Sequence, residues 1–151
     1  YLAKPFHKEE LLVRMEKLIA LRLQLQERFQ KTGTLRQILN NSSPTKEEVF
    51  LQKVLQIIEK NLKDENFGMP QLCKELHLGS SHLFRKLKAL TDKSATHLIR
   101  SMRLEKGKKL LETTHLNVSE VCFEVGFSNV AYFSRVFQEK YGSPPSVFQK
   151  T

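Results

Sequence analysis

The chain has 151 residues, and 25 Lys and Arg against 16 Asp and Glu give it a formal net charge of +9. Hydrophobic residues make up 40%, so we expect a packed core rather than a disordered chain. The low count of two Cys excludes a disulfide-stapled miniprotein and favours the reducing cytoplasm. No apolar run approaches the ~20 residues that a membrane span needs. Without such a run we expect no membrane contact by this chain. The positive charge suggests a polyanionic partner, although a basic surface can equally serve solubility alone.

The first residues predict a long amphipathic helix. Because Tyr1 is not an initiator methionine, we expect the chain to be a piece of a longer protein. Residues 7–31 contain neither Gly nor Pro, and apolar residues recur at steps of three and four, as at Leu11, Met15 and Leu18. The favoured interpretation is a helix that packs on its own domain. The alternative is a homodimer through a coiled coil, for which the heptads are few.

A linker and a second helix follow. Residues 32–45 are rich in turn-forming and cap-forming types, so we expect a linker there. Thr45 and Glu48 have the spacing of a capping box, which predicts a helix over residues 46–62. Its expected buried face consists of apolar side chains at helical spacing: Phe50, Val54, Ile57 or Ile58, and Leu62.

From residue 69 onward the sequence contains an internal repeat of a helix, a tight turn and a helix. Before and within the turn, matching residues share one offset: Cys73 and Cys122, Leu76 and Val125, Leu78 and Phe127. After the turn the second copy has one additional residue, and the matches continue: Leu83 and Phe133, Arg85 and Arg135, Leu87 and Phe137. So many matched pairs are not readily explained by chance.

The repeated unit has the properties of a helix-turn-helix motif. Two helices that cross at ~90–120° need a small side chain where they approach, and Cys73 and Cys122 fit this requirement. Gly126 is suited to a left-handed turn residue, whereas the first copy has His77 at the matching position. Two ordinary helical hairpins in a bundle are the alternative. That alternative leaves the polar and basic faces of the second helices unexplained, so we favour a tandem helix-turn-helix.

The second helix of such a motif lies in the major groove of DNA. At 100° per residue, the face opposite the apolar stripe supplies the candidate DNA-contacting residues: Ser81, Phe84, Arg85 and Lys88 in the first unit, Ala131, Ser134, Arg135 and Gln138 in the second. Arg pairs with guanine, Gln with adenine, and Ala131 or Phe84 can touch a thymine methyl group. Ser80 and Asn129 at the helix entrances complete the set, with helix capping as their simpler role. Lys86 or Lys88 can instead meet phosphates.

Residues 94–112 between the two units predict a single connecting helix. Its apolar set is Leu98, Ile99, Met102, Leu110 and Leu111, and its other faces are basic: Arg100, Arg103, Lys106, Lys108 and Lys109. At ~1.5 Å per residue this helix spans nearly 30 Å. That length suits two recognition helices in successive major-groove segments ~34 Å apart.

Residues 46–151 resemble the AraC/XylS-type DNA-binding domain. The matching segments are 83–88, Arg103-Leu104 with Leu110-Leu111, 125–129 with 132–137, and 141–145. The resemblance implies an all-α fold of seven helices, with helix-turn-helix units at about 69–90 and 118–140 joined by a connecting helix at about 94–112. It also implies a bacterial transcription regulator that binds double-stranded DNA and can meet RNA polymerase.

Two positions depart from the pattern of that family. Asp92 stands where the family prefers Gly, and Ala95 where it prefers Pro, so we expect a slightly altered end of the first unit. Val130 and Ala131 offer few hydrogen-bonding groups, so the second recognition helix would rely on Arg135 and on DNA shape. Sequence specificity would then be stronger in the first unit.

Residues 1–6, followed by a helix with an acidic start, resemble the end of a response-regulator receiver domain. In that family the Lys of the Lys-Pro-Phe motif, here Lys4, pairs with the phosphorylated aspartate. This resemblance implies that residues 1–31 are a receiver remnant and that the chain is the output end of a two-component regulator. A hybrid sensor with kinase activity elsewhere in the full-length protein fits the same pattern.

Other functions are less well supported by the sequence. Cys73 and His77 lie four residues apart, and His82 and Cys122 could complete a metal site, but both Cys occupy core positions of their motifs. No Gly-rich phosphate loop, nucleophile elbow or paired-carboxylate motif occurs, so we expect no enzyme, cofactor or metal. A helical interaction module or a non-specific nucleic-acid binder is the alternative function. Duplex binding predicts steep salt dependence, whereas RNA binding would require exposed aromatic residues.

Overall fold

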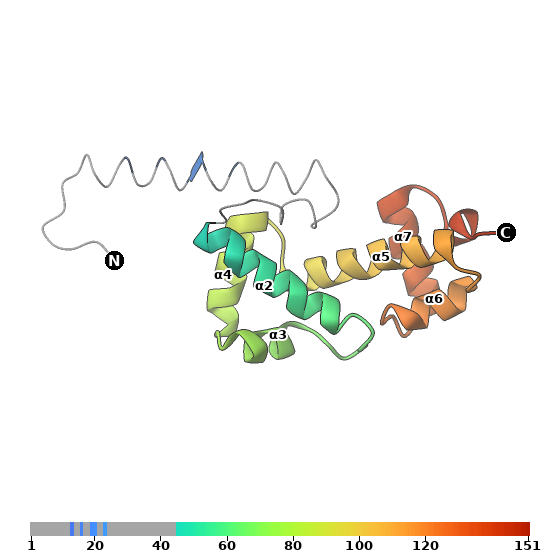
Figure 1. Ribbon diagram of the computed structural model, residues 1–151, viewed down its shortest axis with the longest axis horizontal. Coiled ribbons are helices and arrows are strands. Elements are labelled where there is room, and N and C mark those ends of the chain that lie inside the picture. Colours follow the sequence, from blue (N-terminus) through green and yellow to red (C-terminus); the bar gives the residue numbers. More distant parts are fainter. Residues whose placement is uncertain (1–12, 14–15, 17–18, 21–22, 24–44) are drawn as a thin grey trace, which may run out of the picture.

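The computed structural model describes residues 13, 16, 19–20, 23 and 45–151, and these contain helices joined by short turns (Figure 1). Six α-helices follow one another: α2 (Lys46–Lys60), α3 (Met69–Leu76), α4 (Ser80–Thr91), α5 (Ala95–Thr113), α6 (Val118–Glu124) and α7 (Val130–Tyr141). A 3-10 helix, η2 (Pro145–Phe148), follows α7. The all-α fold class is therefore confirmed.

The described residues 13, 16, 19–20 and 23 are helical, and Val13, Ile19 and Leu23 are each about half exposed. The rest of the expected N-terminal helix, most of the expected linker, and Lys4 lie outside the described residues. The coiled-coil homodimer predicted from this segment lies outside them as well.

The start of α2 follows the sequence prediction. The Glu48 amide donates to Thr45 Oγ1 over 3.2 Å, and the Thr45 amide donates to Glu48 Oε2 over 2.8 Å, so the expected capping box is present. The helix ends at Lys60, two residues before the predicted end, and a loop of residues 61–67 leads to α3. Val54, Ile58 and Leu62 are buried as expected.

The helices form two lobes, one at each end of α5 (Figure 1). The first lobe comprises α2, α3, α4 and the N-terminal part of α5, and its core is mostly aliphatic. The fully buried side chains at its centre are Leu51, Val54, Ile58, Leu72, Leu83, Leu87 and Leu98. The sequence predicts Leu83, Leu87 and Leu90 as the buried stripe of α4, and all three are buried.

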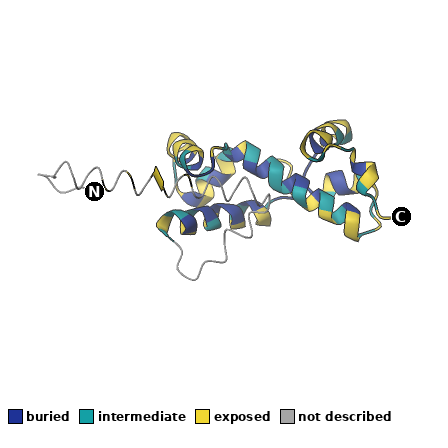
Figure 2. Ribbon diagram, turned by 90° about the horizontal axis from the view of Figure 1, so that it is seen from above, coloured by how far each residue is buried: buried dark blue, intermediate teal, exposed yellow. Residues whose placement is uncertain are grey.

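The second lobe comprises the C-terminal part of α5, α6, α7 and η2, and aromatic rings dominate its core. The Phe133 ring centroid lies 5.1 Å from that of Phe127 and 5.6 Å from that of Phe137. Phe137 in turn contacts Tyr141 at 4.7 Å and Phe148 at 5.4 Å. Such tilted ring pairs stabilise a core beyond the area that they bury. Exposed residues lie on the outer faces of both lobes (Figure 2).

The expected count of seven α-helices over residues 46–151 is wrong for this part of the chain. The last expected helix is only the single 3-10 turn η2, which follows the extended N-cap Pro144 and ends at Phe148. In the described part of the chain, the helices fall short of the length and apolar character needed to cross a membrane.

Candidate nucleic-acid interface

The first helix-turn-helix consists of α3 and α4. His77 ends α3 with a left-handed φ of 54°, and the Leu78 amide donates to the Cys73 carbonyl over 3.1 Å. Gly79 is the N-cap of α4 and makes no side-chain cap bond. The predicted capping role of Ser80 is therefore wrong, because Ser80 is already the first residue of the helix.

The second helix-turn-helix consists of α6 and α7 and repeats the same backbone path. Gly126 has a left-handed φ of 90°, as predicted, and the Phe127 amide donates to the Cys122 carbonyl over 3.0 Å. Asn129 caps α7 by accepting a bond from the Tyr132 amide over 2.8 Å, which confirms its capping role. Ser128 is the additional residue of the second copy, since it lies between the matched turn residue Phe127 and the N-cap.

The left-handed end of α4 explains one departure from the family pattern. Asp92 adopts a φ of 58°, a conformation that glycine enters most easily. Its side chain pairs with Lys88, whose Nζ lies 3.4 Å from Asp92 Oδ1. Ala95 is almost fully buried in the first core, directly after the N-cap Ser94.

The outer face of α4 carries the predicted DNA-contacting residues of the first unit. Ser80, Ser81, Phe84, Arg85 and Lys88 are exposed, and Phe84 is 48% exposed. Met69, Ser80, Ser81, Phe84 and Arg85 line a shallow hollow beside the helix. Arg85 Nε donates to the Ser81 carbonyl over 3.4 Å, a long bond that leaves most of the guanidinium open. Lys86 instead lies over the Phe50 ring of α2, at 4.0 Å from its centroid.

The outer face of α7 presents the predicted residues of the second unit. Ala131, Arg135 and Gln138 are exposed, with Asn129 at the entrance of the helix, and Ser134 is half-buried. The Arg135 guanidinium lies 5.3 Å from the centroid of the Tyr132 ring, within the range of a cation–π contact. The structure thus gathers each predicted set on the outer side of its own second helix.

Two residues at this surface were not found from the sequence. Tyr132 is 38% exposed beside Arg135, and Arg100 Nη1 of α5 donates to its hydroxyl over 3.5 Å. Tyr132 and Arg135 are three residues apart on one helix, and this spacing could have indicated from the sequence that Tyr132 lies beside Arg135. The contact between Arg100 and Tyr132 joins helices distant in the sequence, so no local pattern indicates it.

One basic residue of α7 faces away from this surface. Lys140 Nζ donates to Ser101 Oγ over 2.7 Å and to Glu105 Oε1 over 3.4 Å. Burial lowers the pKa of Lys140, and the negative charge of Glu105 opposes that change. Burial likewise raises the pKa of Glu105. Lys140 therefore holds α7 against α5.

Arg103 does not belong to the basic outer face of the connecting helix, as the sequence had suggested. It is buried, and its guanidinium donates to backbone carbonyls of the loop after α2. At 100° per residue, Leu104 lies about 180° from Ala95, so the apolar face of α5 changes sides between the two cores. A projection with a single apolar face therefore misplaced Arg103. Lys106 and Lys109 are exposed as expected.

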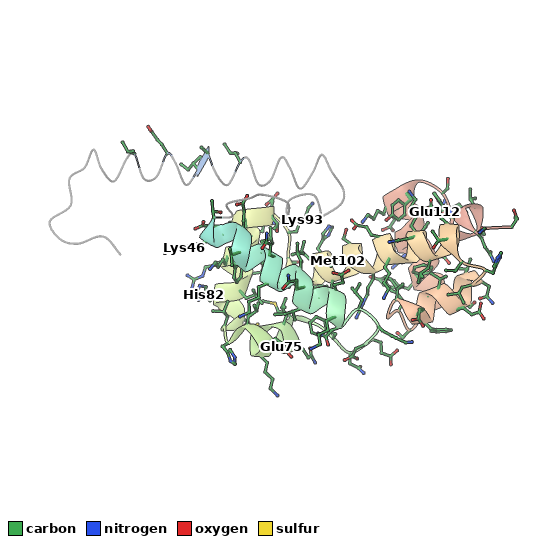
Figure 3. The ribbon with its side chains drawn as sticks, in the orientation of Figure 1. Lys46, Glu75, His82, Lys93, Met102 and Glu112 are labelled. Atoms are coloured by element: carbon green, nitrogen blue, oxygen red, sulfur yellow. The ribbon has the colours of Figure 1, made fainter. Side chains whose placement is uncertain are left out.

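The Cys and His residues that the structure describes do not converge on a metal site. The Cys122 side chain is fully buried, its Sγ donates to the Phe127 carbonyl over 3.8 Å, and burial raises its pKa. Cys73 packs at the edge of the first core. His77 is exposed, and His82 lies on the outer side of α4 (Figure 3). Over the residues that the structure describes, no three potential ligands lie together.

Comparisons with known proteins point to one group. A family model described as a helix-turn-helix domain matches residues 72–151. The C-terminal domain of the two-component response regulator yesN from Fusobacterium nucleatum is 30% identical, with a TM-score of 0.61. That match covers 66% of this chain and 96% of the solved structure.

Two curated relatives are similar over different parts of the chain. The histidine kinase P4 of Formosa agariphila is 33% identical over 99% of this chain. The arabinose operon regulatory protein of Escherichia coli is 32% identical over 66% of this chain. The matches cover 11% and 34% of those two proteins, so the chain corresponds to only part of each.

Proposed function

The chain belongs to the AraC-type family of helix-turn-helix DNA-binding domains, and we propose that it binds a specific double-stranded DNA site with both units at once. The observation that carries the proposal is the matched pair Arg85 and Arg135. Each is exposed on the second helix of its unit, opposite the buried stripe of Leu83 and Leu87 or of Phe133 and Phe137. Arg is the side chain best suited to read guanine in the major groove.

The connecting helix supports simultaneous binding by the two units. Its 19 residues correspond to a length of about 28 Å at 1.5 Å per residue. Successive major-groove segments on one side of B-DNA lie about 34 Å apart. The length of α5 is therefore compatible with recognition helices placed in two successive major-groove segments.

The two surfaces favour unequal shares in sequence recognition. On α4, Arg85, Lys88 and Phe84 are all exposed. On α7, Arg135 is held beside Tyr132, Lys140 is turned towards α5, and Ala131 carries no polar group. We propose that the first unit makes the larger contribution to specificity, and that the second contributes through Arg135, Gln138 and the shape of the groove.

Selection of bound sites from a random DNA pool tests this function. We expect an enriched sequence with two half-sites about one helical turn apart. Arg85→Ala should then reduce affinity for that sequence by roughly 10- to 100-fold and relax the preference at one position, and Arg135→Ala should have a smaller effect. Lys53→Ala on α2 removes one exposed positive charge away from both recognition helices and is the matched control.

The outcome separates the proposal from its alternatives. A pool without enrichment, bound with steep salt dependence, would indicate non-specific nucleic-acid binding. The absence of DNA binding would indicate a protein-interaction module, which should bind its protein partner with weak salt dependence. An Arg85→Ala variant that keeps full specific affinity would contradict the role assigned to α4.

We propose further that this domain is the output end of a two-component regulator, with residues 1–31 as the end of a receiver domain. The support is the similarity over almost the whole chain to a protein named as a histidine kinase, and the response-regulator domain among the similar structures. DNA binding, with RNA polymerase as the next partner, would then be the non-enzymatic part of a cytoplasmic signalling protein. In the full-length protein, Lys4→Ala should abolish signal-dependent transcription while the DNA affinity of the 151-residue chain stays unchanged. Unchanged signal dependence would contradict the proposal.

A further inference from the structure

The two lobes share α5 but have separate cores. Ala95, Leu98 and Ile99 pack in the first core, and Leu104 and Leu111 pack in the second. Because the apolar face of α5 changes sides between these groups, the lobes hold the helix from different directions. The contacts at the change of sides lie between the two lobes and therefore bear on their relative orientation.

Arg103 occupies that position and reaches into the first lobe. Its Nε donates to the Leu62 carbonyl over 3.1 Å, and its Nη2 donates to the Asp64 carbonyl over 2.6 Å and the Phe67 carbonyl over 3.5 Å. Leu62 and Phe67 are themselves buried in the first core. A guanidinium offers five donors in a rigid planar fork, so one side chain can bind all three carbonyls of the loop.

The second lobe closes over the same contact. Gly126, in the turn of the second helix-turn-helix, lies so close that a Cβ there would collide with the Leu62 carbonyl oxygen and lie 2.9 Å from Arg103 Nε. Lys63 and Glu124 form an ion pair of 2.9 Å across the same boundary. That pair is largely exposed and contributes little, whereas the Arg103 bonds to the Leu62 and Phe67 carbonyls are buried.

We propose that Arg103 is a positioning residue that fixes the two helix-turn-helix units at one separation and orientation. We call its contacts with the 61–67 loop, together with Gly126 above them, the junction. Loss of the guanidinium would remove this donor from the buried Leu62 and Phe67 carbonyls, whereas the Asp64 carbonyl would still accept from the Phe67 amide. Buried carbonyls without donors are a state that proteins relieve by moving apart to admit water. The lobes would then keep their own cores while their relative orientation varied.

The consequence for DNA recognition rests on the function proposed above. One base pair more or less between half-sites changes their separation by about 3.4 Å and rotates one by about 35°. A rigid pair of recognition helices cannot follow that change, whereas a loosened pair can. The junction would therefore set the half-site spacing that the protein accepts.

Residual dipolar couplings of backbone amides test the junction without DNA. In the wild-type chain, amides of both lobes should fit one alignment tensor. In Arg103→Met each lobe should still fit its own structure, but the two lobes should require different tensors. Lys106→Met, at an exposed position of the same helix, is the matched control and should behave as wild type. A single tensor for Arg103→Met would overturn the proposal.

If Arg103→Met does not fold, the conservative variant Arg103→Lys can be used in the same measurement of dipolar couplings. Arg103→Lys retains the charge but concentrates its donors at one atom, which cannot reach all three carbonyls. We expect two tensors for this variant as well. Loss of ordered structure in both lobes of Arg103→Lys would overturn the proposal too, because Arg103 would then be required for folding rather than for orientation.

A second measurement uses DNA duplexes with the half-site spacing changed by one base pair. Wild type should lose roughly tenfold or more in affinity, while Arg103→Met should lose less than about threefold and should bind an isolated half-site as wild type does. An unchanged spacing penalty in Arg103→Met would overturn the inference alone. If Arg103→Met requires two alignment tensors but the wild-type chain selects no DNA sequence, the proposed function alone would be overturned.

Discussion

The two helix-turn-helix units follow the same backbone path with different side chains. The left-handed turn residue is His77 in the first and Gly126 in the second, and the N-cap is Gly79 in the first and Asn129 in the second. Each unit thus uses a flexible Gly once, at opposite ends of its turn. The fold therefore requires a left-handed residue after the first helix of each unit and an N-cap before the second helix. Different residue types can fill both positions.

The cores and outer faces of the two units differ more than their backbones. The first core is mostly aliphatic, whereas the second is a chain of ring contacts from Phe127 through Phe133 and Phe137 to Phe148. On the outside, the predicted DNA-contacting residues of α4 include two exposed cationic side chains, Arg85 and Lys88, whereas those of α7 include one, Arg135. Packing requirements keep the buried positions apolar in both units, while the exposed positions are free to diverge in chemistry.

The largest expected effect on the free energy of unfolding comes from substitutions in the two cores. Phe133→Ala removes a fully buried ring that contacts two other rings and lies close to Gly107 of α5. We expect it to lower the free energy of unfolding by about 4 kcal/mol, and the matched Leu83→Ala in the first unit to lower it by about 3 kcal/mol. Urea denaturation of both variants measures the difference.

The exposed Phe123→Ala is the control for this pair, since its ring is 54% exposed and should contribute within about 0.5 kcal/mol. A Leu83→Ala variant that is destabilised more than Phe133→Ala would show that the ring contacts add nothing beyond their size. The aromatic character of the second core would then carry no energetic weight.

The next largest effect lies in the turns. Gly126→Ala combines a left-handed φ with a collision against the Leu62 carbonyl, and we expect it to cost about 3 kcal/mol. Gly142→Ala is the matched control, because Gly142 has a φ of 77° but open space around its Cα. It should cost about 1 kcal/mol, the cost of the conformation alone. Equal losses of thermal stability in the two variants would contradict the close approach at the junction.

Much of the helical frame could be predicted from local patterns. The capping box at Thr45 and Glu48, the left-handed Gly126, and the alternation of buried and exposed residues on α4 and α7 all depend on neighbours within a few residues. The repeat added the pairing between units, including the additional residue after the turn. For the candidate site, the same periodicity correctly separated Arg85 and Arg135 from the buried stripes.

The rest depended on contacts between distant segments. Arg103 looked like one more basic residue of α5, because its carbonyl partners lie about 40 positions earlier in the chain. Lys140 of α7 likewise has its partners, Ser101 and Glu105, on α5, more than 30 positions earlier in the chain. A periodicity of one helix contains no information about which other helix covers it. Such residues were therefore placed correctly only by the structure.

The smallest expected effect lies at the N-caps and has opposite signs in the two units. Asn129→Gly removes the bond to the Tyr132 amide and should lower the free energy of unfolding by a few tenths of a kcal/mol. Gly79→Asn should raise it by a similar amount, because a Cβ at Gly79 would meet open space and the backbone there is already extended. Paired urea midpoints are the measurement, since they avoid the error of extrapolating to water. If Gly79→Asn destabilises the chain instead, the first turn needs glycine for a reason other than space, and the two turns are less equivalent than their shared backbone path indicates.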